Sequence, residues 1–323
     1  MTVPAVAVVE DVWGEALDQL AAELPVLVDP AAWMDSGKLA RAAGNVRGLV
    51  VRNRTQVTRQ LLEASPALEV VARAGVGLDN VDLDAADDLG VVVVTAAGAN
   101  AASVAEHALA MALALARDLA GHDRRVREGR WERDLGRELA GRCWGVVGLG
   151  ATGTATAALA AALGMEVVGY DPFIPPGQGP PVERAGDLGA LLARADVVSL
   201  HLALSPDTAG LIGADALNRM RPGSYLVNVA RGGLVDEAAL VQALRDGPLA
   251  AAALDVRASE PPPPGELEAE RRVLLTPHVA GITAEAQERV VSVLAGDLRR
   301  VLAGEEARNP AGARRRPARS KAS

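Results

Sequence analysis

The chain of 323 residues is poor in aromatic side chains and has a single cysteine. Aromatic residues make up 2% of it, so its core must be packed mainly with valine, leucine and alanine. Cys143 has no partner for an internal disulfide, which fits a reducing compartment, and we expect a cytoplasmic protein. No apolar run reaches the roughly 20 residues that a membrane-spanning helix needs. The amino-terminal segment carries acids where a signal peptide would carry basic residues.

Metal-binding side chains and positive charge are also scarce. The four histidines and the cysteine show no spacing typical of metal ligands, so we expect no metal. The net charge is −8, yet six basic residues and no acid follow from Arg308 onward, which leaves −14 on the rest of the chain. Such an acidic body argues against a nucleic-acid-binding surface. Residues 311–323 are interpreted as a disordered basic tail rather than a segment that binds an anionic surface.

Short valine-rich runs alternate with amphipathic segments in the first hundred residues. Because strands buried on both faces and separated by helices form parallel sheets, this part predicts a parallel α/β sheet. A long, largely buried helix is expected next, at Ser103–Leu119. The predicted strands are Val6–Glu10, Val26–Val28, Gly48–Arg52, Leu68–Arg73 and Val91–Thr95, and the predicted helices between them are Trp13–Glu23, Thr58–Ala64 and Leu83–Leu89.

A second alternation of strands and helices follows. Six strands in succession, with a glycine-rich turn after the first, predict a doubly wound dinucleotide-binding domain. A last helix is expected at Ala284–Leu302. The predicted strands are Trp144–Val147, Glu166–Tyr170, Val197–Leu200, Tyr225–Val229, Ala251–Val256 and Val273–Thr276, and the predicted helices are Thr152–Leu163, Leu188–Ala195, Ala214–Met220 and Glu237–Leu244.

The turn after the first strand of this second region has the spacing G-x-G-x-x-G. In it Gly148 permits a tight turn, Gly150 lets the backbone approach a pyrophosphate, and Gly153 allows close packing of the following helix. The next strand ends at Asp171, 23 positions after Gly148, where an acid accepts hydrogen bonds from ribose hydroxyls. An aspartate there repels a 2′-phosphate. The cofactor is therefore predicted to be NAD rather than NADP.

Three complementary side chains follow strands of the predicted nucleotide-binding sheet. Because ligands bind at the carboxyl ends of such strands, Arg231, Glu260 and His278 are expected near one crevice. We expect Arg231 to bind a substrate carboxylate and polarise the 2-oxygen. His278 is the expected base for the hydroxyl proton, and Glu260 is expected to fix its tautomer and raise its pKa. The pattern predicts hydride transfer at C2 of a 2-hydroxy acid.

Six motifs together resemble the D-isomer-specific 2-hydroxyacid dehydrogenase family over nearly the whole chain. They are RAGVGLDNVD from Arg73, NAASVAEH from Asn100, GLGATG from Gly148, VNVARGGLVDE from Val227, ALDVRASEPP from Ala253 and TPHVAG from Thr276. The resemblance implies a Rossmann NAD domain, residues 99–284, inserted into a flavodoxin-like substrate domain of residues 1–98 and 285–310. It also implies a homodimer built on the segment around Ser103–Leu119, and roles for Arg231, Glu260 and His278 that match the chemistry above.

The resemblance assigns further residues to two ligands. Those implied to bind the cofactor are Val76, Gly148, Leu149, Gly150, Ala151, Thr152, Gly153, Tyr170, Asp171, Leu202, Val229, Ala230, Asp255 and Gly281. Within the family, VRNRTQVT and VARAGVGLDN are most similar to the phosphoglycerate dehydrogenase branch, in a short form without a regulatory domain. That branch implies 3-phosphoglycerate as substrate, bound by Arg52, Arg54, Arg73, Ala74, Gly75 and Asn100, although solvated loop arginines are an alternative, above all for Arg54.

Several positions depart from the family pattern. They are Val76, Ala151 with Thr152, Leu202 with Ala203, and Arg257, which stands where an aromatic residue is usual. These changes remove cofactor contacts and leave other substrates open, including hydroxypyruvate and glyoxylate. A dinucleotide-sensing binding protein, similar to corepressors of the family, is the alternative from another functional class, because fold does not fix function.

Overall fold

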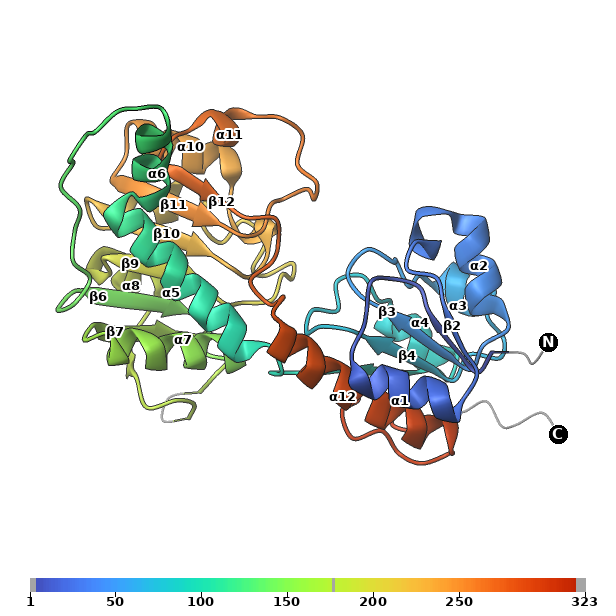
Figure 1. Ribbon diagram of the computed structural model, residues 1–323. Helices are drawn as coiled ribbons and strands as arrows, with labels where there is room; N and C mark the ends of the chain where they lie inside the picture. Colours follow the sequence, from blue (N-terminus) through green and yellow to red (C-terminus); the bar gives the residue numbers. More distant parts are fainter. Residues whose placement is uncertain (1–3, 176–177, 318–323) are drawn as a thin grey trace. The chain divides into compact units, whose positions relative to one another are not determined.

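The structure is a computed structural model that describes residues 4–175 and 178–317. The chain divides into two compact units. Unit 1 contains the residues up to Asn100 together with those from Ile282 onward, and unit 2 is Ala101–Gly281. The boundaries expected from the sequence were 98/99 and 284/285. Unit 1 is thus built from both ends of the chain, as the colours of Figure 1 show.

Unit 1 is organised around a five-stranded parallel sheet in the order β2-β1-β3-β4-β5, which is the flavodoxin-like order. Alternate side chains of β1 and of the residue after it enter two different cores: Val6 and Val8 face one cluster, and Ala7 and Val9 the other. The sheet is therefore covered on both faces. Its strands are β1 (Val6–Val8), β2 (Val26–Val28), β3 (Gly48–Val51), β4 (Val70–Arg73) and β5 (Val92–Thr95).

Helices from both ends of the chain cover the sheet of unit 1. The first core cluster includes side chains of α1 (Glu15–Glu23) and α12 (Ala284–Leu302), which lie side by side in Figure 1. The second includes side chains of three other helices. These are α2 (Ser36–Gly44), α3 (Arg59–Glu63) and α4 (Leu83–Asp88), and a short 3-10 helix, Ala32–Met34, precedes α2.

The segment after α12 returns to the edge of the unit 1 sheet. The Ala311 N–H donates to the Val93 carbonyl at 2.8 Å, and Arg314 donates through Nη2 to the Asp87 carbonyl at 2.7 Å. The expectation of a disordered tail from residue 311 is therefore wrong for residues 311–317, because β5 and α4 offer carbonyl and carboxylate acceptors that the segment reaches. Residues 318–323 lie outside the described part of the chain.

Unit 2 contains a seven-stranded parallel sheet in the order β12-β11-β10-β9-β6-β7-β8. Counted within the unit this is the order 7-6-5-4-1-2-3, the dinucleotide-binding arrangement with one strand added. The sequence predicts six of these strands but not the two-residue β8. The strands are β6 (Cys143–Val147), β7 (Glu166–Tyr170), β8 (Glu183–Arg184), β9 (Val197–Leu200), β10 (Ser224–Asn228), β11 (Leu249–Leu254) and β12 (Val273–Leu275).

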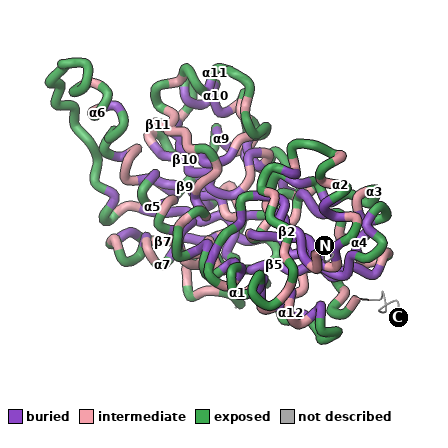
Figure 2. Tube along the Cα trace, turned by 45° about the vertical axis from the view of Figure 1, so that its right-hand side comes forward, coloured by how far each residue is buried: buried purple, intermediate pink, exposed green. Residues whose placement is uncertain are grey.

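Two layers of helices enclose this sheet. The helices α5 (Ala101–Arg117) and α7 (Ala151–Ala162) pack on one face through alanine-rich surfaces. Those on the other face are α8 (Leu188–Arg194), α9 (Ala214–Asn218), α10 (Glu237–Arg245) and α11 (Glu266–Ala269). The central strands β6, β9 and β10 are buried, whereas α6 (Leu119–Arg127) and the chain after it are mostly exposed (Figure 2). Among the described residues, no helix has both the length and the apolar character to cross a bilayer.

One buried carboxylate shapes the loop after β3. Glu10, 2% exposed, accepts three backbone hydrogen bonds: from Arg52 N at 2.7 Å, Thr55 N at 2.9 Å and Arg54 N at 3.0 Å. An uncompensated buried donor costs about 1–3 kcal/mol. This single side chain therefore determines where the loop that carries Arg52 and Arg54 leaves the sheet.

We predict that Glu10→Gln lowers the free energy of unfolding of unit 1 by about 1–3 kcal/mol, because an amide N–H₂ would face one of the three N–H groups. Urea denaturation followed by circular dichroism measures the change. Glu63→Gln, at an exposed position of α3, is the matched control and should stay within about 0.5 kcal/mol of the parent chain. Equal stability of the two variants would contradict the anchoring role of Glu10.

Candidate active site

The glycine-rich turn between β6 and α7 is shaped to bring backbone N–H groups to a ligand. Gly148 has φ +93°, a conformation that L side chains rarely adopt. A Cβ on Gly153 would lie 1.9 Å from the Gly148 carbonyl oxygen, so only glycine lets α7 start against the turn. A Cβ on Gly150, by contrast, would meet no protein atom within 4 Å. The start of α7 is therefore open where a pyrophosphate would meet its first N–H groups and the positive end of its dipole.

Asp171 lies directly after β7 and beside this turn. Its Oδ2 accepts from Leu149 N at 2.8 Å and its Oδ1 accepts from Phe173 N at 2.9 Å. A carboxylate has about four acceptor positions, so each oxygen can still accept a hydroxyl. The open turn, the helix start and this acid fit a dinucleotide with ribose hydroxyls.

The other residues expected at the cofactor are distributed over both units. Leu149, Leu202, Val229 and Ala230 are buried at the carboxyl-terminal side of β6, β9 and β10. Ala151 and Thr152 begin α7, and Tyr170 ends β7. Val76 belongs to unit 1, and Gly281 is the last residue of unit 2.

The structure joins two of the three expected catalytic side chains directly. His278 Nδ1 lies 2.7 Å from Glu260 Oε2. A carboxylate only accepts hydrogen bonds, so Nδ1 carries the proton and Nε2 is the basic nitrogen of the neutral ring. Burial raises the pKa of Glu260, but its hydrogen bond to His278 and the charges of His278 and Arg231 lower it by more, leaving the pKa below its ordinary value. Glu260 thus remains an acceptor at neutral pH.

The loop that carries His278 is held by Asp255, which follows β11. Asp255 Oδ1 accepts from Val279 N at 2.9 Å, and Oδ2 accepts from Ala280 N at 2.8 Å. The Thr276 hydroxyl donates to Oδ1 at 2.5 Å. His278 itself has φ +56°, which is uncommon for a residue other than glycine. Because the Asp255 side chain has no exposed surface, it acts on the site by fixing this loop.

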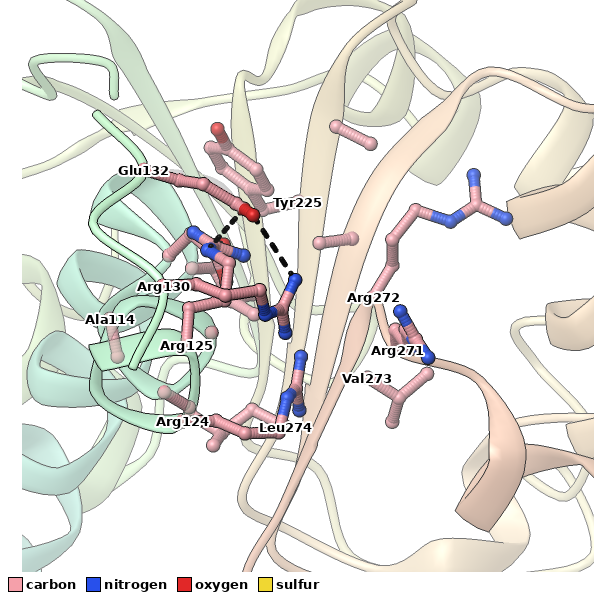
Figure 3. Close-up of a pocket in the computed structure, with 16 residues that line it drawn as sticks. Ala114, Arg124, Arg125, Arg130, Glu132, Tyr225, Arg271, Arg272, Val273 and Leu274 are labelled. Atoms are coloured by element: carbon pink, nitrogen blue, oxygen red, sulfur yellow. Dashed lines mark hydrogen bonds and ion pairs between the residues drawn. The ribbon is translucent and has the colours of Figure 1, made fainter. Parts of the chain in front are cut away.

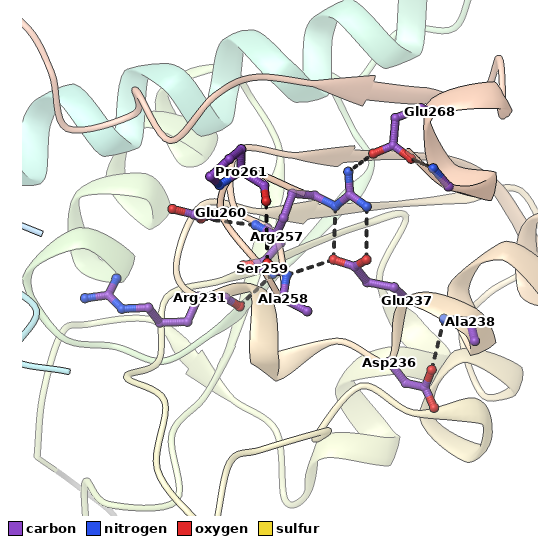
Figure 4. A network of polar contacts seen from close by, with 12 residues as sticks. Arg231, Asp236, Glu237, Ala238, Arg257, Ala258, Ser259, Glu260, Pro261 and Glu268 are labelled. Carbon is purple, nitrogen blue, oxygen red and sulfur yellow. Dashed lines mark hydrogen bonds and ion pairs between the residues drawn. The ribbon is translucent and has the colours of Figure 1, made fainter. Parts of the chain in front are cut away.

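A charged network that the sequence analysis missed supports the loop of Glu260. Arg257 donates through Nε and Nη2 to the two carboxylate oxygens of Glu237, each at 3.0 Å, and also pairs with Glu268. Glu237 further accepts from Ala258 N at 2.8 Å. Figure 4 shows Arg257 between the two acids, one of which begins α10. The available signal was the acid in GLVDE, six residues after Arg231.

Arg231 leaves β10 on the loop next to that of Glu260. A Cβ on the following residue, Gly232, would lie 1.9 Å from the carbonyl carbon of Arg257, so glycine lets the two loops touch. The backbone carbonyl of Arg231 accepts from Asn228 Nδ2 at 2.9 Å. Figure 4 shows the side chains of Arg231 and Glu260 directed to the same side of the network. A cation, a carboxylate and an imidazole therefore belong to one region of unit 2.

The expected substrate arginines lie in unit 1, and their surroundings differ. Arg52 is partly buried, which lowers its pKa, and its Nη1 donates to the Asp11 carbonyl at 3.0 Å. Arg54 stacks over Trp33, with its guanidinium carbon 4.8 Å from the ring centre. Arg73 is 8% exposed and packs against Gly75. Ala74 follows β4, and Asn100 ends the first segment of unit 1.

Unit 2 contains three further histidines. His107 Nε2 lies 3.2 Å from the Thr276 hydroxyl. His122 Nδ1 lies 3.0 Å from Arg125 Nη2. His201 Nε2 lies 3.0 Å from the Ser199 hydroxyl. In the described part of the chain, no group of three or more His, Cys, Asp or Glu side chains has an arrangement that could hold a metal ion.

Residues 109–280 match the family model described as the D-isomer specific 2-hydroxyacid dehydrogenase, NAD binding domain. The match covers more than half of the chain. This chain belongs to that family. Its nucleotide-binding unit is accordingly the family's NAD-binding domain, which confirms the prediction made from the motifs.

Curated relatives carry two different substrate names. D-3-phosphoglycerate dehydrogenase of Mycobacterium leprae is 47% identical over 280 residues, which are 84% of this chain and 52% of the relative. (S)-Sulfolactate dehydrogenase of Chromohalobacter salexigens is 42% identical over 292 residues, 89% of this chain and 94% of the relative. The chain spans about half the length of the phosphoglycerate dehydrogenases that it matches.

Solved structures of the family have the same fold. A protein from Thermus thermophilus superposes with a TM-score of 0.88 at 35% identity and covers 95% of this chain and 99% of its own. A glyoxylate reductase from Paecilomyes thermophila gives a TM-score of 0.84 at 27% identity, with 96% and 99% covered. The prediction of two parallel α/β sheets is confirmed.

We predict opposite behaviour for two glycine substitutions in the turn. Gly153→Ala should lower both the stability of unit 2 and its affinity for NADH, because its Cβ would clash with the Gly148 carbonyl. Gly150→Ala should leave stability within about 0.5 kcal/mol of the parent and weaken NADH binding alone, because its Cβ points into open space. Fluorescence titration and thermal unfolding measure the two effects. Normal NADH affinity in Gly150→Ala would place the pyrophosphate elsewhere.

Proposed function

We propose that this chain interconverts a D-2-hydroxy acid and the corresponding 2-oxo acid with NAD as cofactor. The observation that supports this best is the 2.7 Å hydrogen bond between Glu260 and His278, in the same unit as the glycine-rich turn. The pair supplies an oriented base whose free nitrogen is Nε2. The turn supplies the site for a dinucleotide, whose nicotinamide ring accepts or donates a hydride when bound.

The proton and the substrate charge are handled by side chains of unit 2. In the oxidative direction His278 Nε2 removes the proton of the C2 hydroxyl, while the Glu260 carboxylate stabilises the imidazolium that forms. In the reductive direction the imidazolium returns that proton to the 2-oxygen. Arg231 binds the substrate carboxylate and polarises the 2-oxygen, because a planar guanidinium forms two parallel hydrogen bonds with a carboxylate.

The cofactor is NAD rather than NADP in this proposal. Asp171 lies beside the glycine-rich turn, held there by Leu149 N. A carboxylate at this position accepts hydrogen bonds from both ribose hydroxyls and repels a 2′-phosphate. The proposed preference therefore rests on one negative charge at the end of β7.

The substrate that we propose is 3-phosphoglycerate or a close analogue with an anionic group at C3. Phosphoglycerate and sulfolactate, the substrates named for two relatives, both carry such a group beside the C2 hydroxyl. Arg52 and Arg73 are the residues proposed to bind it, because both follow or end adjacent parallel strands. Arg54 is the weaker candidate, since its guanidinium already stacks on Trp33.

We also propose that the chain forms a homodimer through α5, α6 and the segment after them. Large apolar side chains there are exposed, including Trp131 at 81% and Leu135 at 101% of their full accessible areas. Exposed apolar groups of this size are typical of contact surfaces. The segment expected from the resemblance, around Ser103–Leu119, directly precedes the chain that carries these side chains.

We predict that NAD is reduced at least about tenfold more efficiently, in kcat/KM, with 3-phosphoglycerate than with D-glycerate, which lacks the second anion. Arg52→Gln should lower the ratio of the two kcat/KM values, because it raises KM for 3-phosphoglycerate and leaves KM for D-glycerate unchanged. Arg59→Gln, an exposed arginine of unit 1 paired with Asp88, is the control and should leave the ratio unchanged. In the reductive direction, a higher kcat/KM for glyoxylate or hydroxypyruvate than for the 2-oxo acid of 3-phosphoglycerate would reject the C3-anion proposal. Tight NADH binding without turnover of any acid would instead favour a sensing protein.

We predict that His278→Ala lowers kcat by about 10²–10⁴-fold, the usual contribution of a positioned general base, and leaves NADH affinity nearly unchanged. Glu260→Gln should lower kcat by a smaller factor than His278→Ala does. The amide oxygen still accepts a hydrogen bond from Nδ1–H but cannot stabilise the imidazolium by charge. His122→Ala is the control histidine in the same unit. Stopped-flow single turnovers and NADH fluorescence measure both properties. Parent-like turnover in His278→Ala would mean that another group is the base.

A further inference from the structure

The segment that carries Glu260 has little apolar packing of its own. After Val256, which is 2% exposed, the next buried side chain is Leu267. Residues 258–261 between them are all exposed. Loops with so few buried contacts open locally at little cost in free energy. Polar contacts must therefore hold the Glu260 carboxylate beside His278.

The backbone of Arg257 supplies one such contact. Its N–H donates to Glu260 Oε1 at 3.2 Å, while His278 Nδ1 lies 2.7 Å from Glu260 Oε2. Burial raises the pKa of Glu260, and the Arg257 N–H is among the contacts that lower it. Because each carboxylate oxygen has its own partner, the rotation of the carboxylate is determined as well as its position. The Arg257 N–H thus helps to direct Oε2 at the imidazole.

The side chain of Arg257 fixes where this N–H lies. Glu237 accepts two hydrogen bonds from the Arg257 guanidinium, each at 3.0 Å, and a third from Ala258 N at 2.8 Å. The remaining guanidinium nitrogen pairs with Glu268. Glu268 in turn accepts from Gly265 N at 2.9 Å, at the far end of the exposed segment. Both ends of that segment are therefore tied to one guanidinium group, on a side chain that is 9% exposed.

Glu237 provides a rigid reference for these contacts. It is the first residue of α10, whose start is capped by Asp236 Oδ1, which accepts from Ala238 N and Ala239 N, each at 3.0 Å. The helix buries four apolar side chains in the core of unit 2. The hydrogen bond from Arg257 lowers the pKa of Glu237, so the acid is ionised at neutral pH. The position of Arg257 is thus determined by a packed helix.

A second charged network of unit 2 lies at the opposite end of the strands. Figure 3 shows it around Glu132, whose Oε2 lies 3.4 Å from Arg125 Nε. These side chains line a pocket together with Tyr225 and Val273, near the starts of β10 and β12. Arg257 instead follows β11, whose six residues span roughly 20 Å at about 3.3 Å per residue. The network of Arg257 is therefore the one at the end of the sheet where the candidate active site lies.

We propose that Arg257 is a positioning residue for the reaction, because its ion pairs hold its backbone N–H against Glu260 Oε1 and so direct Oε2 at His278. The inference rests on the proposed function, in which His278 is the base and Glu260 is its partner. Arg257 acts through Glu260 and is not itself a catalytic residue. A guanidinium suits this task because its five N–H donors bond two carboxylates at once, whereas an ammonium is a point charge on a flexible chain.

The first test is steady-state kinetics of the full chain with NAD and 3-phosphoglycerate. Arg257→Met should lower kcat by about 10–100-fold, because a misplacement of about 1 Å can cost about 10²-fold in rate. KM and the affinity for NADH should change by less than about twofold, since the Arg257 side chain is not among the groups proposed to bind either ligand. Arg257→Lys should lower kcat by a smaller factor, because its ammonium retains one ion pair.

Arg245→Met is the matched control. Arg245 Nη1 lies 3.1 Å from Glu266 Oε1, so this pair joins the same two helices, α10 and α11. Its loss should leave kcat within about twofold of the parent value, because an exposed ion pair contributes little and this one makes no contact with Glu260.

A double-mutant cycle separates positioning from a general structural effect. In the Glu260→Ala background the carboxylate is absent, so adding Arg257→Met should lower kcat further by less than about twofold. Losses that multiply, each as large as in the single variants, would make the effect of Arg257 independent of Glu260 and overturn the proposal. So would a parent-like kcat in Arg257→Met combined with a lowered kcat in Glu260→Ala.

Crystal structures of the parent and of Arg257→Met test the geometry without any measurement of activity. We expect the distance between Glu260 Oε2 and His278 Nδ1 to exceed about 3.5 Å in the variant, beyond hydrogen-bond range. A distance that stays at 2.7 Å overturns the proposal whatever the kinetics show. A lengthened distance in a chain that turns over no 2-hydroxy acid would confirm the positioning and reject the proposed function alone. If Arg257→Met does not fold, Arg257→Lys takes its place in the cycle and in the crystal.

Discussion

The candidate active site depends on a carboxylate that never meets solvent. Asp255 follows β11 and accepts hydrogen bonds from two backbone N–H groups and from the Thr276 hydroxyl. These bonds fix the backbone of the loop from Thr276 to Ala280. In this loop His278 has a left-handed backbone conformation, and its ring is hydrogen-bonded to Glu260. Strained conformations of this kind cost about 1–3 kcal/mol and persist only where neighbouring contacts determine them. Here the buried acid supplies those contacts.

Carboxylates that accept backbone N–H bonds fix loops elsewhere in the chain as well. Glu10 holds the loop after β3, Asp171 holds the glycine-rich turn, and Asp297 of α12 accepts from Arg308 N at 2.7 Å and Asn309 N at 3.1 Å. Parallel sheets leave the loops at their strand ends without ladder partners, and a carboxylate accepts several N–H bonds at once. Part of the excess negative charge therefore serves to fix loops, including those that carry the side chains proposed to bind ligands.

How far the sequence predicts the structure depends on the signal that each feature leaves. Strands Val26–Val28, Glu166–Tyr170 and Val197–Leu200 were predicted with their observed bounds, because each contains a valine-rich run that is followed by a polar residue. Helices α2 and α6 were missed, since SGKLARAAG contains two glycines and LAGHDRRVR is mostly polar. Tertiary contacts of the buried Ala42 and Ala43, rather than intrinsic propensity, stabilise α2.

The candidate site also combines features that the sequence shows with features that it does not show. The glycine spacing and the order of the three catalytic candidates are visible in the sequence, because they depend on strand ends. The role of Arg257 is not. Interpreted from the sequence as a departure from the family pattern, it proves to be 9% exposed in its side chain and paired with two acids that come from α10 and α11. Such pairing links segments 20 and 11 residues away, and spacing alone does not reveal it.

The surroundings of His201 differ from those of His278, and the difference bears on which of the two can act as the base. Trp144 is the largest fully buried side chain, and its indole N–H donates to the Ser199 hydroxyl at 2.8 Å. Because an indole only donates, the Ser199 hydroxyl is left to donate to His201 Nε2, 3.0 Å away. Burial lowers the pKa of His201 to about 3, so this imidazole stays neutral and is a poor proton acceptor at neutral pH. His278 is partly exposed and lies beside the ionised carboxylate of Glu260, and this contrast in surroundings, more than the residue type, supports His278 as the proposed base.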